Sequence, residues 1–112
     1  MPKLYKNACV QGTASIGTYT TLYSTNSSTS AVLSTIAICN AASADATYRV
    51  GITDSATDPS LTTGQFIAYG STVAGNDTTF ISVGVALGNN KFIRVSSSSA
   101  SVNFNAFISE IT

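Results

Sequence analysis

The side chains that could carry out chemistry in this chain are few. Cys9 and Cys39 could form a disulfide, bind a metal or act as nucleophiles, but the chain has no CxxC spacing and no histidine to complete a zinc site or activate a thiolate. Both fall in apolar runs, so we expect buried, unreactive side chains, with a disulfide between them as the alternative. No serine lies in a GxSxG motif, and no histidine can serve as its base.

The carboxylates are the remaining candidates for chemistry. Asp54 and Asp58 flank the longest expected loop, where they could bind calcium, but calcium takes six to eight oxygen ligands. Two aspartates in such a loop are more typical of turn formation. Glycoside cleavage would need two of only five acidic residues to converge. We therefore predict a protein that is not an enzyme and holds no metal or cofactor.

Arg49 and Arg94 are the charged residues that fall in the middle of expected strands. In a chain this poor in charge, each should reach a specific carboxylate or carbonyl group. Asp45, Asp54 and Glu110 are candidate partners, in the same subunit or in a neighbouring one. Arg49, Arg94 and Glu110 are thus candidate ion-pair residues, and the alternative is an arginine solvated on a strand face.

Charge and hydropathy exclude several classes of partner. Charged residues make up 9% of the chain, against about 25% in an ordinary domain, and the formal net charge is zero. A nucleic-acid-binding protein needs a basic surface, so we expect no nucleic-acid partner. No apolar run reaches the roughly 18 residues of a spanning helix, and the opening residues lack the apolar stretch of a secretory signal. We expect synthesis in the cytoplasm and no membrane partner.

The chain is typical of one all-β domain. Its 112 residues fit a single domain over 1–112, and 17 serines and 16 threonines accompany many β-branched and aromatic residues. Alternation with period two predicts about eight strands at roughly ten-residue spacing, which favours a single antiparallel β-sandwich or jelly roll. The expected strands are 4–10, 19–24, 31–40, 47–53, 66–73, 79–87, 91–95 and 102–109.

The alternation also predicts which side chains face the core. In 31–40 we place Val32, Ser34, Ile36 and Ile38 on one face and the intervening residues, Leu33 among them, on the other. Inward sets elsewhere are Tyr48, Val50 and Ile52, then Ile81, Val83, Val85 and Leu87, and finally Val102, Phe104, Ala106 and Ile108. The sequence 88–90, Gly-Asn-Asn, predicts a hairpin, and the serines at 96–99 predict a loop.

The composition favours self-association. A surface of short hydroxyl and amide side chains without net charge has little repulsion against copies of itself. Such side chains also lose little entropy when they pack against a partner. We expect a homo-oligomer, such as a trimer, in preference to a monomer that merely carries few charges.

Several segments resemble small virion proteins of tailed bacteriophages. The likeness runs from about Tyr19 to Thr112, as a pattern of strands and turns without a catalytic signature. The segments that carry it are 21–24 (Thr-Leu-Tyr-Ser), 31–40, 46–50 (Ala-Thr-Tyr-Arg-Val), 67–69 (Ile-Ala-Tyr), 75–78 (Gly-Asn-Asp-Thr) and 102–111.

This resemblance implies a β-sandwich structural protein that is present in many copies in the virion. The leading hypothesis is a capsid decoration, or cement, protein that binds the major capsid protein, and the alternatives are a neck, tail or fibre attachment protein. Residues 1–10 would be a docking arm or a first strand. The candidate partner-binding residues are Pro2, Lys3, Leu4, Tyr5, Lys6, Asp58 and Pro59.

A second hypothesis is a carbohydrate- or receptor-binding module of a fibre or adhesin. Tyr19, Tyr23 or Tyr69 would then stack on a sugar. The chain lacks tryptophan, which is common in such sites, so tyrosines in the core or in an interface are the favoured interpretation.

Overall fold

A computed structural model describes residues 3–12, 15–54 and 65–111, and the statements below refer to these residues. They form eight β-strands and no α-helix, so no helix could cross a membrane. The strands are β1 (Lys3–Gln11), β2 (Thr20–Ser24), β3 (Ser30–Asn40), β4 (Ala46–Thr53), β5 (Phe66–Val73), β6 (Asp77–Leu87), β7 (Phe92–Ser97) and β8 (Val102–Ile111). Each coincides with one of the eight predicted runs to within a few residues.

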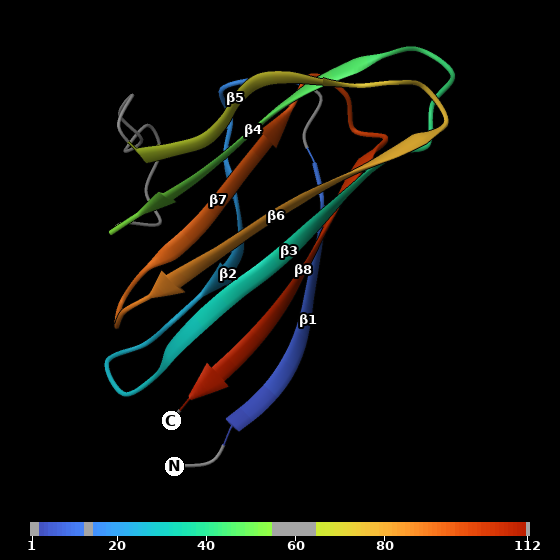
Figure 1. Ribbon diagram of the computed structural model, residues 1–112. Coiled ribbons are helices and arrows are strands. Elements are labelled where there is room, and N and C mark those ends of the chain that lie inside the picture. Colours follow the sequence, from blue (N-terminus) through green and yellow to red (C-terminus); the bar gives the residue numbers. More distant parts are fainter. Residues whose placement is uncertain (1–2, 13–14, 55–64, 112) are drawn as a thin grey trace.

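The strands form two four-stranded antiparallel sheets that pack face to face (Figure 1). The first sheet has the order β1-β8-β3-β6 and the second has the order β2-β7-β4-β5. Most connections cross from one sheet to the other, and the result is a jelly-roll arrangement. This confirms the predicted all-β sandwich. The first residue of β1 and the last residue of β8 lie at the same end of the sandwich, because β1 and β8 are antiparallel neighbours.

The predicted hairpin at 88–90 is wrong. The turn connects β6 to β7, but β6 pairs with β3 in the first sheet while β7 pairs with β2 and β4 in the second. The turn chemistry itself is present, since Asn90 has a positive φ of 58°. Turn residues report only the local backbone, and the same reversal can lead to a neighbouring strand or across the roughly 10 Å between sheets.

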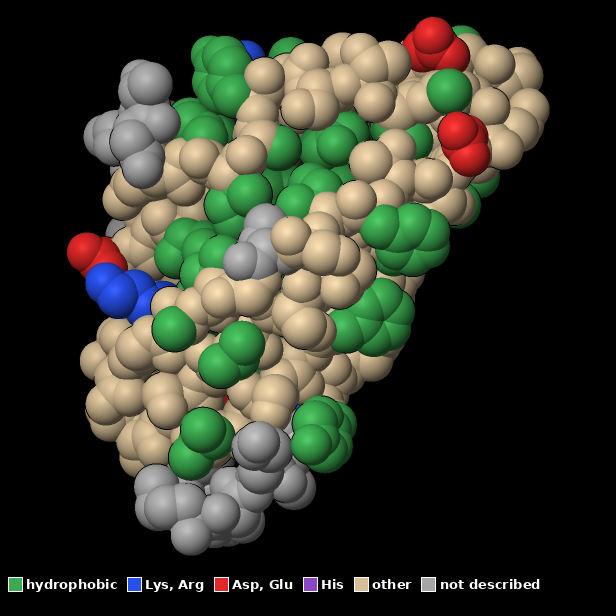
Figure 2. Space-filling view, in the orientation of Figure 1, with side chains coloured by type: hydrophobic (Ala, Val, Ile, Leu, Met, Phe, Trp, Pro, Cys, Tyr) green, Lys and Arg blue, Asp and Glu red, His purple; other side chains and the backbone are tan. Residues whose placement is uncertain are grey.

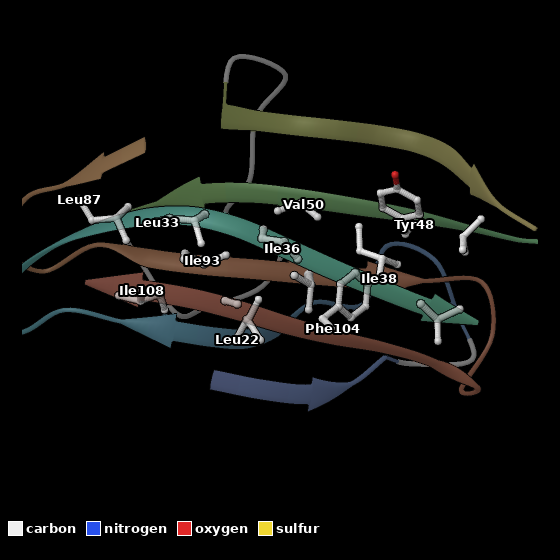
Figure 3. Packing of buried hydrophobic residues seen from close by; sticks show 14 of the residues in the cluster. Leu22, Leu33, Ile36, Ile38, Tyr48, Val50, Leu87, Ile93, Phe104 and Ile108 are labelled. Atoms are coloured by element: carbon white, nitrogen blue, oxygen red, sulfur yellow. The ribbon is translucent and has the colours of Figure 1, made fainter. Parts of the chain in front are cut away.

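The core lies between the inner faces of the two sheets (Figure 3). The alternation in β8 is confirmed, because Phe104 and Ala106 are fully buried while Phe107 between Ala106 and Ile108 is exposed. From the second sheet, Tyr48 and Val50 of β4 point into the core, as predicted. The ring of Tyr48 meets that of Phe104 edge to face, with centroids 6.4 Å apart.

The predicted face assignment in β3 is wrong for its first half. Val32 does not share a face with Ile36 and Ile38 as predicted, because Val32 is 38% exposed while the two isoleucines are fully buried. Leu33, predicted on the other face, is fully buried as well. The register of β3 shifts between Leu33 and Thr35 against both of its neighbours. A β-bulge of this kind adds one residue and reverses the phase of the alternation. Both faces of β3 therefore look apolar in the sequence.

The serines at 96–99 do not form the predicted loop throughout. Ser96 and Ser97 belong to β7, pair with Arg49 and Tyr48 of β4, and are fully buried. Ser97 is in phase with Ile93 and Val95 of the core, where a serine is small enough to fit, and the pairing with β4 holds the main chain extended. A run of one polar residue type therefore hides the end of a strand.

Candidate docking surface

The outward side chains that the structure describes on the outer face of the first sheet are uncharged, although Lys6 lines a hollow there. We call this outer face the charge-free face and define it by the outward side chains of the four strands. They are Tyr5, Asn7, Cys9 and Gln11 of β1, Asn103, Asn105, Phe107 and Ser109 of β8, Val32, Thr35, Ala37 and Cys39 of β3, and Thr78, Phe80, Ser82 and Ala86 of β6. In the space-filling view the few charged side chains lie mostly near the margins (Figure 2).

Exposed apolar side chains gather on this face. The structure describes five large hydrophobic residues that are exposed, and Tyr5, Val32, Phe80 and Phe107 of these belong to the charge-free face. Their exposed fractions run from 38% at Val32 to 81% at Tyr5. Single exposed apolar residues are ordinary, but several on one uncharged sheet face indicate a surface for a partner.

A hollow lies between β1 and β8 on this face. Its volume is about 460 Å³, and its floor follows the main chain where Asn7 pairs with Phe107. The Ser34 hydroxyl donates a hydrogen bond to the carbonyl of Phe107 at 2.9 Å, which fixes the bulge of β3 beside the hollow. The lining residues are Tyr5, Lys6, Asn7, Ser34, Phe107, Ile108 and Ser109.

A polar cluster connects the two sheets beneath the hollow. Glu110 of β8 is 7% exposed, accepts a hydrogen bond from the Tyr23 hydroxyl of β2, and lies 3.3 Å from the Lys6 ammonium group of β1. The bond from Tyr23, aided by Lys6, holds the pKa of the Glu110 carboxyl below its ordinary value against the opposing effect of burial. Burial and the same bond raise the pKa of the Tyr23 hydroxyl.

This cluster makes part of the stability depend on pH. Because the pKa of Glu110 is lower in the folded state, its contribution is complete above the unfolded value near 4.5 and is lost as the pH falls through the folded value. We expect Glu110→Gln to destabilise the protein by about 1 to 3 kcal/mol at pH 7, since a charged acceptor is replaced by a neutral one.

Urea unfolding between pH 3 and pH 7 measures this effect. The difference between the wild type and Glu110→Gln should shrink as the pH falls below about 4.5. Asp54→Asn is the matched control, because Asp54 pairs with Lys91 at the surface and its side chain is 76% exposed. A difference for Glu110→Gln that stays constant with pH would contradict the role of the ionised carboxylate.

The two arginines lie on the second sheet. Arg94 is 5% exposed and donates hydrogen bonds to the Thr21 hydroxyl at 2.7 Å and to the Tyr19 carbonyl at 3.1 Å. Arg49 donates a hydrogen bond to the Tyr19 hydroxyl at 3.2 Å, and its guanidinium carbon lies 4.2 Å from the centre of the Tyr69 ring. Lys6, and not an arginine, is the cation that the structure places beside Glu110.

The predicted docking residues have different positions. Lys3, Leu4, Tyr5 and Lys6 form the first half of β1 and pair with β8, so this segment is a strand of the sheet. Tyr5 and Lys6 also line the hollow. Pro2, Asp58 and Pro59 lie outside the described residues.

The expectation of two buried cysteines is wrong. Cys9 is exposed, Cys39 is intermediate, and both are free thiols. Ala8 and Val10 contact the core, so Cys9 between them must point outward. Cys39 points outward for the same reason, because Ile38 and Asn40 on either side are buried. The apolar character of a run does not tell which of its residues face inward.

The three tyrosines considered for sugar stacking do not form one platform. Tyr19 is 9% exposed, and Tyr23 is bonded to Glu110. Tyr69 is 63% exposed, but Arg49 stacks on its ring and Phe66 meets it at 4.8 Å between centroids.

The sequence contains one signal for this surface. Alternation alone places Phe107 on the outward side of its strand, and an aromatic residue at an outward position of a regular strand indicates an interface. Phe80 carries the same signal, because the predicted inward set of 79–87 begins with Ile81 and leaves Phe80 on the outward side, where it is 65% exposed.

Comparison with known proteins finds no matching family model, no similar curated protein and no similar solved structure.

Proposed function

We propose that the protein is a non-enzymatic accessory subunit of a tailed-bacteriophage virion, a capsid decoration protein that self-associates and docks on the particle. The charge-free face is the observation that carries this proposal. The sequence resemblance supplies three parts of this proposal: the location in the virion, the phage capsid protein as partner and the decoration role. The fold supports them because its two-sheet sandwich presents one broad, uncharged face.

The size of the face suits a docking surface. Four strands of about ten residues, spaced about 4.8 Å apart, cover roughly 600 Å² in projection. A stable interface buries about 800 Å² on each partner. The face therefore supplies most of one side of an ordinary interface, with aromatic anchors among amide and hydroxyl groups. A subunit docked across capsomers stabilises the shell because the shell opens only when these contacts also break.

The docking prediction concerns two exposed aromatic residues. We expect the double variant Phe80→Ser, Phe107→Ser to fold normally, since both side chains are more than 40% exposed, and to bind particles at least tenfold more weakly. Tyr69→Ser is the matched control, because Tyr69 is as exposed as Phe80 but lies on the second sheet. Purified chain is mixed with phage particles assembled without it and pelleted, and the bound amount is measured.

The outcomes separate the parts of the proposal. A wild-type chain that stays in the supernatant would overturn the virion role. A double variant that pellets like the wild type would show that another surface docks. Antibody labelling of complete particles in the electron microscope then gives the location. Label over the heads is expected, and label confined to the neck or tail would overturn the decoration role.

A further inference from the structure

The free edge of β1 differs from the other three edges of the sandwich. β2 has only five residues and a register shift. β5 has two register shifts against β4 and a positive φ at Gly70, and β6 has a shift against β3 and a positive φ at Gly84. Such irregularities prevent another strand from pairing. β1 keeps an unbroken register with β8 over all nine residues, so it is the regular edge among the described strands.

The main-chain groups of β1 that face this edge can be identified. Gly12, directly after β1, donates its N–H to the carbonyl of Val102 at 2.7 Å, and these two residues continue the register of the β1–β8 pair. In an antiparallel ladder every second residue bonds the same neighbour. Lys6, Ala8 and Val10 therefore bond β8, and the N–H and C=O groups of Tyr5, Asn7 and Cys9 point to the free edge.

We propose that the edge of β1 pairs with β1 of a second copy, antiparallel and across a twofold axis, so that one eight-stranded sheet runs through both subunits. The inference rests on the proposed self-association and names its partner surface. A second copy of the chain is the favoured partner because β1 can pair with its own copy without bringing like charges together.

Full overlap of two β1 strands occurs in the register centred on Asn7. It sets Asn7 opposite its own copy, Tyr5 opposite Cys9, and Lys3 opposite Gln11. Lys6 then faces Ala8, so no lysine lies opposite a lysine and no like charges repel. This register forms about ten main-chain hydrogen bonds between the copies. A twofold axis at Lys6 instead would place two ammonium groups together.

The pairing also continues the charge-free face. Tyr5, Asn7 and Cys9 point to the outer side of the sheet, and their copies would continue the same surface across the axis. The hollow beside Tyr5 and Phe107 then lies next to its copy. Two hollows and two sets of aromatic side chains would then face the particle surface together. Binding through both subunits at once raises the overall affinity for the particle.

The mass in solution and two substitutions at one position test the pairing. Light scattering of the wild type should give twice the chain mass of 11.5 kDa. Asn7→Pro removes the N–H that faces the edge and leaves the bonds to β8 intact, so it should give the monomer mass. Asn7→Ala keeps the N–H and loses only the side chain, and it should stay a dimer.

Hydrogen exchange of the wild-type chain tests the β1 pairing without the need for any variant to fold. The amides of Ala8 and Val10 should exchange slowly at every protein concentration, because they bond β8. The amides of Asn7 and Cys9 should become at least tenfold slower as the concentration rises through the dimer transition. Fast exchange of Asn7 and Cys9 in the dimer would overturn the pairing.

The remaining outcomes distinguish this inference from the proposed function. A dimer that persists in Asn7→Pro would overturn the β1 pairing and leave self-association through another surface standing. A wild-type monomer at high concentration that still pellets with particles would overturn the pairing and leave the docking role. A wild-type monomer that also fails to pellet with particles would overturn both the β1 pairing and the docking role.

Discussion

Replacing Phe104 with alanine is expected to lower the free energy of unfolding by about 3 to 5 kcal/mol. Phe104 is the largest of the fully buried side chains, lies in the middle of the first sheet on β8, and packs against the ring of Tyr48 from the second sheet. The loss includes the transfer of the ring from water and the cavity that the surrounding residues cannot fill. The total free energy of unfolding of a domain of this size is only about 5 to 15 kcal/mol. The variant should therefore unfold at a much lower urea concentration than the wild type.

Phe107→Ala provides the matched control on the same strand. Phe107 points to the opposite side of the sheet and is 41% exposed, so the same chemical change should cost less than about 1 kcal/mol. Urea unfolding of both variants, followed by circular dichroism, measures the two losses. Equal losses would contradict the assignment of inner and outer faces in β8.

Asn40→Ala is expected to destabilise the protein by about 2 to 4 kcal/mol, the second largest effect. Asn40 ends β3 and is 1% exposed. Its amide donates to the carbonyls of Ala44 at 2.8 Å and Val73 at 3.3 Å, and its oxygen accepts from the N–H of Ala42 at 3.0 Å and the hydroxyl of Ser101 at 3.3 Å. Alanine would leave these groups without their partner where water has little access, and each such loss is costly.

Asn89→Ala tests whether burial of the hydrogen bonds is the reason for the large loss of stability expected in Asn40→Ala. Asn89 also donates its side-chain amide to a carbonyl, that of Ser27 at 2.8 Å, but at the surface, where water replaces the bond. Its loss should cost less than about 1 kcal/mol in the same unfolding measurement. If Asn40→Ala cost no more than Asn89→Ala, the hydrogen bonds of Asn40 would not be what holds the end of β3.

The positions of the strands follow from the sequence, and their partners do not. Alternation over 102–109 identifies both the strand and its inner face, because β8 is regular. The bulge beside Ser34 reverses the faces of β3, and it depends on β6 and β8, which come much later in the chain. The two-sheet order likewise depends on distant pairing, so the turn at 88–90 could be located but its connection could not.

The candidate surface could be predicted only in part. The sequence favours Tyr5 and Lys6 as docking residues because segment 2–6 looks too short to form core contacts of its own, and both residues line the hollow. The cluster of Lys6, Tyr23 and Glu110 could not be found, because Tyr23 and Glu110 are 87 residues apart and nothing local indicates their contact. Cys9 is exposed because the other side of β1 faces the second sheet. The packing of the two sheets decides which side that is, so the sequence of β1 alone does not predict it.

The central position of β8 in the first sheet has a consequence for synthesis of the chain. β8 lies between β1 and β3, so neither of these can complete its pairing until the last strand has left the ribosome. The nascent chain therefore carries an incomplete first sheet until β8 emerges. Contacts between the two ends of a chain form slowly because a long loop must close first. The first sheet should therefore be completed only after β8 has emerged, and a chain truncated before β8 should remain unfolded.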